Sequence, residues 1–226
     1  MELRMRYELL VGKRTLIIGG LRSGKTKLTA EIVRGLMGQI GSLTLMDFAP
    51  GRGGVGLPLS NYMSVENCER PEGLHAPRIE SRNAEEVLRL ARDNEEKIRP
   101  ILISFLSRPT DALVINDLTI YLHSGDPDLL LKCIYSSKTF VGNAYYGKDF
   151  DDKGSGLNER ERTLVEELMK AMDFVIKMDR SPPQLKRLKG NKRAARGEPY
   201  GKDRRGLGSP PLAQLYSQCD PGENRS

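Results

Sequence analysis

The feature that most constrains this chain is the stretch Gly-Gly-Leu-Arg-Ser-Gly-Lys-Thr at positions 19–26. It follows a short apolar run, Arg14–Ile18, that predicts a buried strand. It opens a segment, Lys25–Met37, whose apolar residues recur at helical spacing. Glycines at such a junction let the backbone curl so that successive N–H groups point inward, and the helix N-terminus adds positive potential. The stretch therefore predicts a loop that binds phosphate groups.

The residues of this loop have expected roles. Lys25 should reach the β- and γ-phosphates of a nucleoside triphosphate, and the hydroxyl of Thr26 should be a ligand of Mg²⁺. The residues expected to cradle the phosphates are Gly19, Gly20, Leu21, Arg22, Ser23 and Gly24.

Two acidic residues follow predicted strands. Asp117 comes after the apolar run Ala112–Ile115, and an aspartate at the end of a buried strand beside the phosphate loop can hold Mg²⁺. The alternative is that Asp117 caps the next turn. Asp47 comes after Leu43–Met46, where it would orient an attacking water or act as a base, or else only form a turn. We therefore expect Lys25, Asp47 and Asp117 to be catalytic, and Thr26 and Asp117 to bind the metal.

Apolar periodicity places the remaining elements. Further strands are predicted at Thr139–Asn143 and Phe174–Met178. Helices are predicted at Ser81–Arg99 with Asn83 as N-cap, at Ile101–Leu106 beyond an interruption at Pro100, at Asp128–Leu131 and at Asn158–Met172. The Gly- and Pro-rich segment 51–77 is predicted to be a long loop. Strands alternating with helices predict an α/β fold of three layers, with a mainly parallel sheet of about five strands.

The charge is unevenly distributed. The net charge is +6, but residues 181–226 hold ten Lys/Arg and four Asp/Glu, so the remainder is balanced at 26 of each. We expect a nucleotide-binding domain at 1–180 and a basic Pro- and Gly-rich extension at 181–226, extended or disordered. The extension is a candidate for binding nucleic acid or a protein partner. No apolar run spans a bilayer and no signal pattern begins the chain, so a cytoplasmic location is expected.

The loop at 19–26 carries the signature of the P-loop NTPase superfamily, and the chain resembles that superfamily. Together with Asp47 and Pro50 after the second strand, it is similar to the branch of ParA/MinD-type ATPases, GPN-loop GTPases and Clp1-like polynucleotide kinases. Ala49 replaces the second acid common in that branch, and Gly20 replaces the early lysine of ParA-type loops. The loop also resembles that of the bacterial adenosylcobinamide kinases, and Asp117-Leu118-Thr119 is similar to their later strand end.

These resemblances imply Mg²⁺-dependent binding of ATP, with hydrolysis or transfer of its γ-phosphoryl group. The motif by which GTPases read guanine would fall at 176–179, but Ile176 stands where Asn or Thr belongs, so ATP is favoured and GTP stays an alternative. A nucleotide-dependent switch or scaffold, and a small-molecule or polynucleotide kinase, are the other readings. The acceptor or partner is not specified by the sequence.

Four further residues have two interpretations each. Arg52 is either a phosphate-clamping arginine or a solvated loop residue. Tyr145 and Tyr146 either stack on a base or substrate, or close a surface loop. His123 is either a general base or a partly buried structural histidine.

Overall fold

The structure is a computed structural model that describes residues 3–178, 184–187 and 216–218. Its strands are β1 (Leu3–Met5), β2 (Arg14–Gly19), β3 (Leu43–Asp47), β4 (Cys68–Glu69), β5 (Ala112–Asn116), β6 (Thr139–Tyr145), β7 (Phe174–Met178), β8 (Gln184–Arg187) and β9 (Tyr216–Gln218). Its α-helices are α1 (Lys25–Leu36), α2 (Pro77–Glu80), α3 (Ala84–Ser107), α4 (Thr119–Leu122), α5 (Pro127–Ser136) and α6 (Leu157–Lys170). Two 3₁₀ turns, η1 (Tyr7–Leu10) and η2 (Leu59–Asn61), complete the set.

Seven strands form one sheet in the order β4-β3-β5-β6-β2-β7-β8. The first six run parallel, and β8 pairs antiparallel with β7 at the edge. The predicted α/β fold with a mainly parallel sheet is confirmed. The expected number of about five strands is too small, because the sequence analysis missed β4 and β8.

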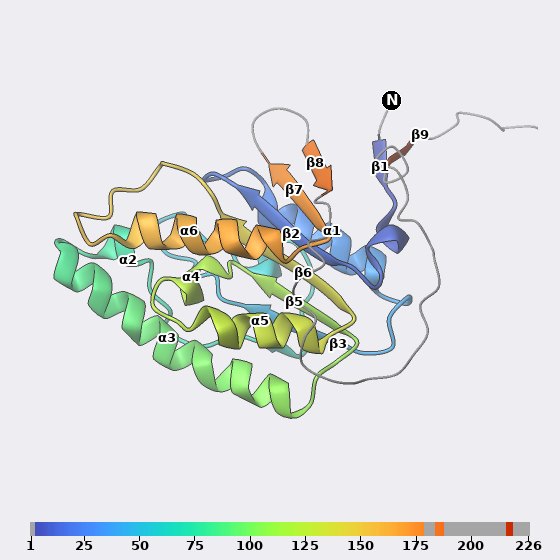
Figure 1. Ribbon diagram of the computed structural model, residues 1–226, viewed down its shortest axis with the longest axis horizontal. Coiled ribbons are helices and arrows are strands. Elements are labelled where there is room, and N and C mark those ends of the chain that lie inside the picture. Colours follow the sequence, from blue (N-terminus) through green and yellow to red (C-terminus); the bar gives the residue numbers. More distant parts are fainter. Residues whose placement is uncertain (1–2, 179–183, 188–215, 219–226) are drawn as a thin grey trace, which may run out of the picture.

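Helices cover both faces of this sheet, so the fold has three layers (Figure 1). Leu16 and Ile18 of β2 pack in the core cluster that α3, α5 and α6 share, whereas Ile17 packs with Ile32 and Val33 of α1. Successive side chains of a strand point to opposite faces. Because both faces are covered, the strands read as continuous apolar runs rather than as alternating patterns.

Helix α3 confirms one local prediction and contradicts another. The side chain of Asn83 accepts a hydrogen bond from the Glu86 N–H at 2.9 Å, as expected of an N-cap. The predicted interruption at Pro100 is wrong, since α3 runs through it without a break. Ile98 and Leu102 on either side of the proline are fully buried against the sheet, while Pro100 is exposed.

Two predicted loops contain regular structure. Segment 51–77 is not a structureless loop, since it includes η2 and the short strand β4, which adds to the edge of the sheet beside β3. The predicted extension at 181–226 contributes β8 to the sheet and β9 to an antiparallel pair with β1. The other residues of that extension lie outside the described residues.

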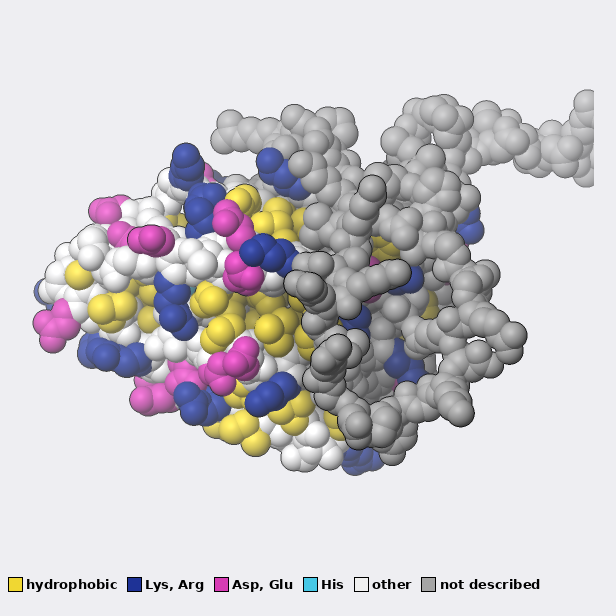
Figure 2. All heavy atoms as spheres, in the orientation of Figure 1, with side chains coloured by type: hydrophobic (Ala, Val, Ile, Leu, Met, Phe, Trp, Pro, Cys, Tyr) yellow, Lys and Arg dark blue, Asp and Glu magenta, His cyan; other side chains and the backbone are white. Residues whose placement is uncertain are grey.

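The surface of the described part is mixed in charge. Figure 2 shows Lys and Arg side chains interspersed with Asp and Glu over the face formed by α3, α5 and α6. Within the described ranges, no helix combines the length and the apolar character needed to cross a membrane.

The topology brings the predicted site residues to one edge. In a parallel sheet the carboxyl ends of all strands lie at the same edge, and ligands bind in the loops beyond it. Asp47, Asp117 and the loop at 19–26 each follow the carboxyl end of such a strand, at β3, β5 and β2.

Candidate phosphate-binding site

The loop at 19–26 joins β2 to α1 as the sequence predicts. Gly24 has φ +88°, a left-handed conformation that favours glycine, and α1 begins at the next residue. No side chain caps α1, and its first turn carries no acidic residue. The first N–H groups of a helix have no partner inside it, so this uncapped end is suited to an anion.

Lys25 lies folded along the loop. Its Nζ donates to the carbonyl oxygens of Gly19 at 3.0 Å and Gly20 at 2.7 Å, and contacts the Ser23 hydroxyl at 3.4 Å. Burial lowers the pKa of Lys25, and the carboxylates of Asp117 and others nearby act in the opposite direction. The carbonyl oxygens and the hydroxyl that Lys25 contacts are uncharged. An anionic phosphate oxygen can replace them and form a charge-assisted hydrogen bond with Lys25.

Asp117 lines the same cleft as Lys25 and Thr26. Its φ is +56°, and its backbone N–H donates to the side-chain oxygen of Asn143 at 2.9 Å. Its Oδ1 accepts a hydrogen bond from the Thr119 hydroxyl at 2.9 Å. Burial raises the pKa of Asp117 to about 6, although Lys25 and Thr119 lower it. A recessed carboxylate that is costly to ionise is a fitting ligand for a cation.

Asp117 and the phosphate loop follow strands that are not neighbours in the sheet. Strand β6 lies between β5, which precedes Asp117, and β2, which precedes the loop. The cleft nevertheless contains both groups, because Asp117 projects from the loop that follows β5.

Asp47 is placed differently. Its carboxylate is 2% exposed and does not line the cleft that contains Lys25 and Asp117. Its Oδ1 accepts from the backbone N–H of Ala49 at 3.2 Å and from the Asn116 side chain at 2.7 Å. Its Oδ2 accepts from the backbone N–H of Leu59 at 2.8 Å. These bonds tie both ends of the loop between Ala49 and Leu59 to the end of β3.

A buried chain of polar groups continues from Asp47 across the sheet edge. The amide nitrogen of Asn143 donates to the side-chain oxygen of Asn116 at 2.6 Å and to the hydroxyl of Thr29 at 2.9 Å. Thr29 in turn donates to the backbone carbonyl of Lys25 at 2.9 Å. The chain therefore links β3, β5, β6 and α1 under the site. The sequence analysis missed Asn143, whose only signal was a polar residue in an apolar strand.

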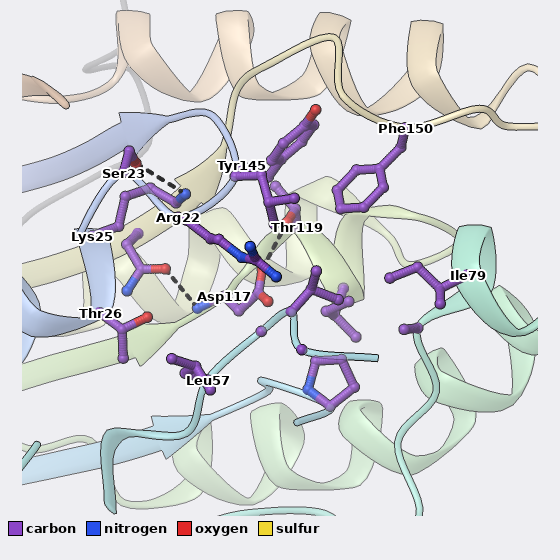
Figure 3. A pocket seen from close by; sticks show the side chains of 18 of the residues that line it. Arg22, Ser23, Lys25, Thr26, Leu57, Ile79, Asp117, Thr119, Tyr145 and Phe150 are labelled. Carbon is purple, nitrogen blue, oxygen red and sulfur yellow. Dashed lines mark hydrogen bonds between the residues drawn. The ribbon is translucent and has the colours of Figure 1, made fainter. Parts of the chain in front are cut away.

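The cleft has two ends (Figure 3). One end is the phosphate loop with Asp117 and Thr119, and the other is formed by the glycine-rich loop 50–57 and the start of α2. It encloses about 860 Å³ of space open to solvent. Leu57 and Ile79 also line the cleft and are each 40% exposed.

A buried ionic cluster forms one wall of the cleft. Arg78 of α2 pairs with Glu161 of α6 through two bonds, at 2.8 and 2.9 Å, and the same carboxylate accepts from His123 Nε2 at 2.7 Å. Burial opposes ionisation of Glu161, but its bonds to His123 and Arg78 outweigh this and hold its pKa below the usual value. Burial lowers the pKa of His123, so its imidazole is neutral at pH 7 and Nε2 carries the proton.

The side chain of His123 is enclosed by the protein. The residue is 3% exposed, and its Nδ1 is buried without a hydrogen-bond partner among the described residues. An atom without accessible surface cannot receive a substrate proton unless the wall opens, so this geometry favours the structural reading over the general base.

The two tyrosines at the end of β6, Tyr145 within the strand and Tyr146 just after it, face different surroundings. The ring of Tyr145 lines the cleft, with Lys25 Nζ at 5.9 Å and the Arg78 guanidinium at 5.1 Å from its centroid. Tyr146 lies outside this cleft and donates to Glu166 at 2.8 Å. Of the two, Tyr145 is therefore the one placed to contact a ligand.

Two charged loop residues lie near the site. Arg52 is half-exposed, pairs with Glu80 at 3.6 Å and does not line the cleft, which favours the alternative of a solvated loop residue. Asp149 reaches the phosphate loop. Its Oδ2 accepts from the backbone N–H of Leu21 at 3.0 Å and from the Tyr145 hydroxyl at 3.1 Å.

Comparisons with known proteins give structural similarity alone. No protein-family model matches the chain, and no curated protein matches it in sequence. The chain is similar in structure to the flagellar accessory protein FlaH from Methanocaldococcus jannaschii, at 13% identity and a TM-score of 0.44, over 80% of this chain and 79% of that one. It is also similar to PH0250 from Pyrococcus horikoshii OT3, at 10% identity and a TM-score of 0.39, over 78% and 87%. Similarity this weak carries no argument about ligand, reaction or partner.

Proposed function

We propose that this chain binds a nucleoside triphosphate with Mg²⁺ at the loop 19–26, and cleaves or transfers the γ-phosphoryl group. The observation that carries the proposal is the meeting of three features in one cleft: the uncapped N-terminus of α1, the amine of Lys25 and the carboxylate of Asp117. An anion-binding helix end, a cation for phosphate and a metal-binding acid are the parts that phosphoryl transfer needs.

Mg²⁺ suits the donors that the cleft offers. The Thr26 hydroxyl and the Asp117 carboxylate are hard oxygen ligands, and Mg²⁺ in nucleotide sites takes one or two such protein ligands and keeps several waters. When bound, the ion would neutralise charge on the β- and γ-phosphate oxygens.

The residues of the chain have distinct tasks in this proposal. The N–H groups of the loop and of the first turn of α1 bind the phosphates, and Lys25 leaves its carbonyl partners for phosphate oxygens. Thr119 orients Asp117 through its 2.9 Å hydrogen bond and favours the ionised carboxylate. Asp47 does not act as a base, because its oxygens already accept three hydrogen bonds in a buried setting. It holds the loop that forms the far end of the cleft.

Transfer to an acceptor is the second candidate, beside hydrolysis. The exposed apolar side chains of Leu57 and Ile79 that line the cleft favour it, since a bound organic molecule would cover them. ATP is the preferred nucleotide in this proposal. Ile176, at the position where a guanine-reading residue belongs, is fully buried in the core, and Asp179 lies outside the described residues.

Calorimetric titration tests the proposal. The full chain is titrated with slowly hydrolysed Mg²⁺-ATP and Mg²⁺-GTP analogues. We expect binding of the ATP analogue at micromolar or tighter affinity, and its loss by about a hundredfold in Lys25→Ala, because a buried charge-assisted contact is removed. Lys27→Ala is the matched control, since Lys27 is exposed on the same helix and does not line the cleft. Equal affinities of Lys25→Ala and Lys27→Ala for the ATP analogue would exclude the loop 19–26 as the nucleotide site.

A further inference from the structure

Arg22 stands out within the phosphate loop. It is the fourth residue of the loop and has φ +54°, a left-handed conformation that an arginine adopts only against its steric preference. Such strained residues cluster at ligand sites, where the surrounding structure maintains them. Backbone strain alone assigns no role to Arg22, so its role is inferred from the surroundings of its side chain.

The guanidinium of Arg22 lies in the cleft without a protein partner. Among the described residues that line the cleft, the other two cations are satisfied: Lys25 by carbonyl oxygens and Arg78 by Glu161. Arg22 lines the same cleft, yet makes no hydrogen bond, ion pair or ring contact in the described part of the chain. A five-donor group placed in a ligand cleft and left unpaired is available to an anion.

The exposed side chain of Arg22 extends close to the glycine-rich loop. A Cβ placed on Gly54 would lie 3.6 Å from Arg22 Nη2, and one placed on Gly56 would lie 3.1 Å from Asp117 Oδ2. The guanidinium and the carboxylate therefore lie beside the same loop, near positions two residues apart. Figure 3 shows the Arg22 side chain extending from the phosphate loop toward Asp117 and Thr119.

This arrangement would distinguish the ends of a bound triphosphate. The helix end and the loop amides would bind phosphates on the side of α1, whereas Arg22 extends toward the side where Asp117 would hold the metal. The lysine and the metal shell both reach the β- and γ-phosphates, so a group beyond them, on the side away from the loop amides, would meet the terminal phosphate. A planar guanidinium offers two parallel N–H donors that match two oxygens of a phosphate.

We propose that Arg22 binds the terminal phosphate of the nucleotide, and that this contact makes the site prefer triphosphate over diphosphate. The inference rests on the proposed function and adds to it the group that recognises the third phosphate. Arg22 then neutralises charge on the transferred phosphoryl group from within the phosphate loop itself.

The test compares two nucleotides in three variants of the full chain. Dissociation constants for Mg²⁺-ADP and for the Mg²⁺ complex of a slowly hydrolysed ATP analogue are measured by calorimetry. Arg22→Ala should raise the dissociation constant of the triphosphate analogue about tenfold to a hundredfold. The dissociation constant of ADP should change by no more than about twofold. Arg22→Lys should recover part of the loss, since it restores charge without the planar fork.

Arg52→Ala is the matched control, because it removes an equal charge from the glycine-rich loop outside the cleft. It should change both constants by less than about twofold. An equal loss of both nucleotides in Arg22→Ala, or no loss of either, would overturn the inference while leaving the proposed function standing. Failure of the unaltered chain to bind either nucleotide would overturn both.

Discussion

Replacing Asp117 with asparagine should stabilise the protein in the absence of ligand. Burial raises the pKa of this carboxyl from 3.8 to about 6 in the folded chain. A carboxyl group whose pKa is higher in the folded chain than in the unfolded chain does not lower stability at a pH below its unfolded pKa. The free energy of unfolding then falls as the pH rises from about 4 through about 6. Above pH 6 the carboxylate is ionised in both the folded and the unfolded state, and the full free-energy cost of burying its charge opposes folding.

The size of the effect follows from that difference. A pKa of about 6 against 3.8 corresponds to about 3 kcal/mol at pH 7.5 as an upper bound. The side chain is partly exposed to the cleft, which reduces the cost, so we expect a gain of about 1–2 kcal/mol. Asparagine tolerates the φ of +56°, and its amide oxygen can still accept the Thr119 hydroxyl. For a domain of this size the gain corresponds to a rise in Tm of roughly 2–8 °C.

Thermal and urea unfolding of the ligand-free protein at pH 7.5 and 4.5 measure the effect. The variant should be more stable at pH 7.5, and the difference should shrink at pH 4.5, where the Asp117 carboxyl is largely protonated in the folded protein. Added Mg²⁺ with an ATP analogue should raise the Tm of the unaltered chain and leave that of Asp117→Asn nearly unchanged.

Asp47→Asn is the matched control and should have the opposite sign. The three donors that surround Asp47 would meet an amide N–H₂ in place of one oxygen, which costs about 1–3 kcal/mol. If Asp117→Asn destabilises the ligand-free protein as much as Asp47→Asn does, then Asp117 is a structural carboxylate and the reasoning is refuted.

Three further substitutions probe the walls of the cleft. Thr119→Val should raise the pKa of Asp117 above about 6, because it removes a hydrogen bond to the ionised form; a carboxyl-carbon NMR titration reports it, and an unchanged midpoint would contradict it. Asp149→Asn should tighten binding of the ATP analogue about threefold to tenfold in calorimetry, because it removes a negative charge from a loop amide; weaker binding would make Asp149 a support of the site. Glu161→Gln should cost about 3–5 kcal/mol in urea unfolding, since it leaves Arg78 buried and unpaired, and a loss below about 1 kcal/mol would contradict that pairing.

The sequence was sufficient for the central strands and for the place of the loop at 19–26 between a strand and a helix. The strands at 14–19, 43–47 and 112–116 are apolar runs of the expected length, and their burial on both faces makes them easy to find. The loop could be recognised because its glycines, lysine and threonine are adjacent in the sequence. The chemistry proposed for them depends on their fixed spacing, so predicting it needs no tertiary information.

Pro100 shows where local rules fail. A proline inside a helix removes one hydrogen bond and disfavours the preceding turn. Here Pro100 lies on the solvent side, where water can satisfy the freed carbonyl, while Ile98 and Leu102 remain buried on the other side. Packing of the long helix against the sheet outweighs the local penalty, and the sequence does not reveal that balance.

The long-range contacts of the site were beyond prediction. Arg78 and Glu161 are 83 residues apart, and nothing in either neighbourhood marks them as partners. The insertion of β6 between β5 and β2 depends on the order of strands, which the pattern of residues along the chain does not specify. The role of Asp47 as a support follows from backbone donors that only the folded loop brings to it.

The most direct test of the proposed site is to locate the metal and the nucleotide on the folded chain. Backbone amide NMR spectra would be recorded with an ATP analogue and Mg²⁺, and then with trace Mn²⁺ as a paramagnetic substitute. We expect shift changes at 19–28 and paramagnetic broadening that is strongest at Thr26 and Asp117. Broadening and shifts that avoid these residues and gather elsewhere would contradict the assignment of this cleft as the nucleotide site.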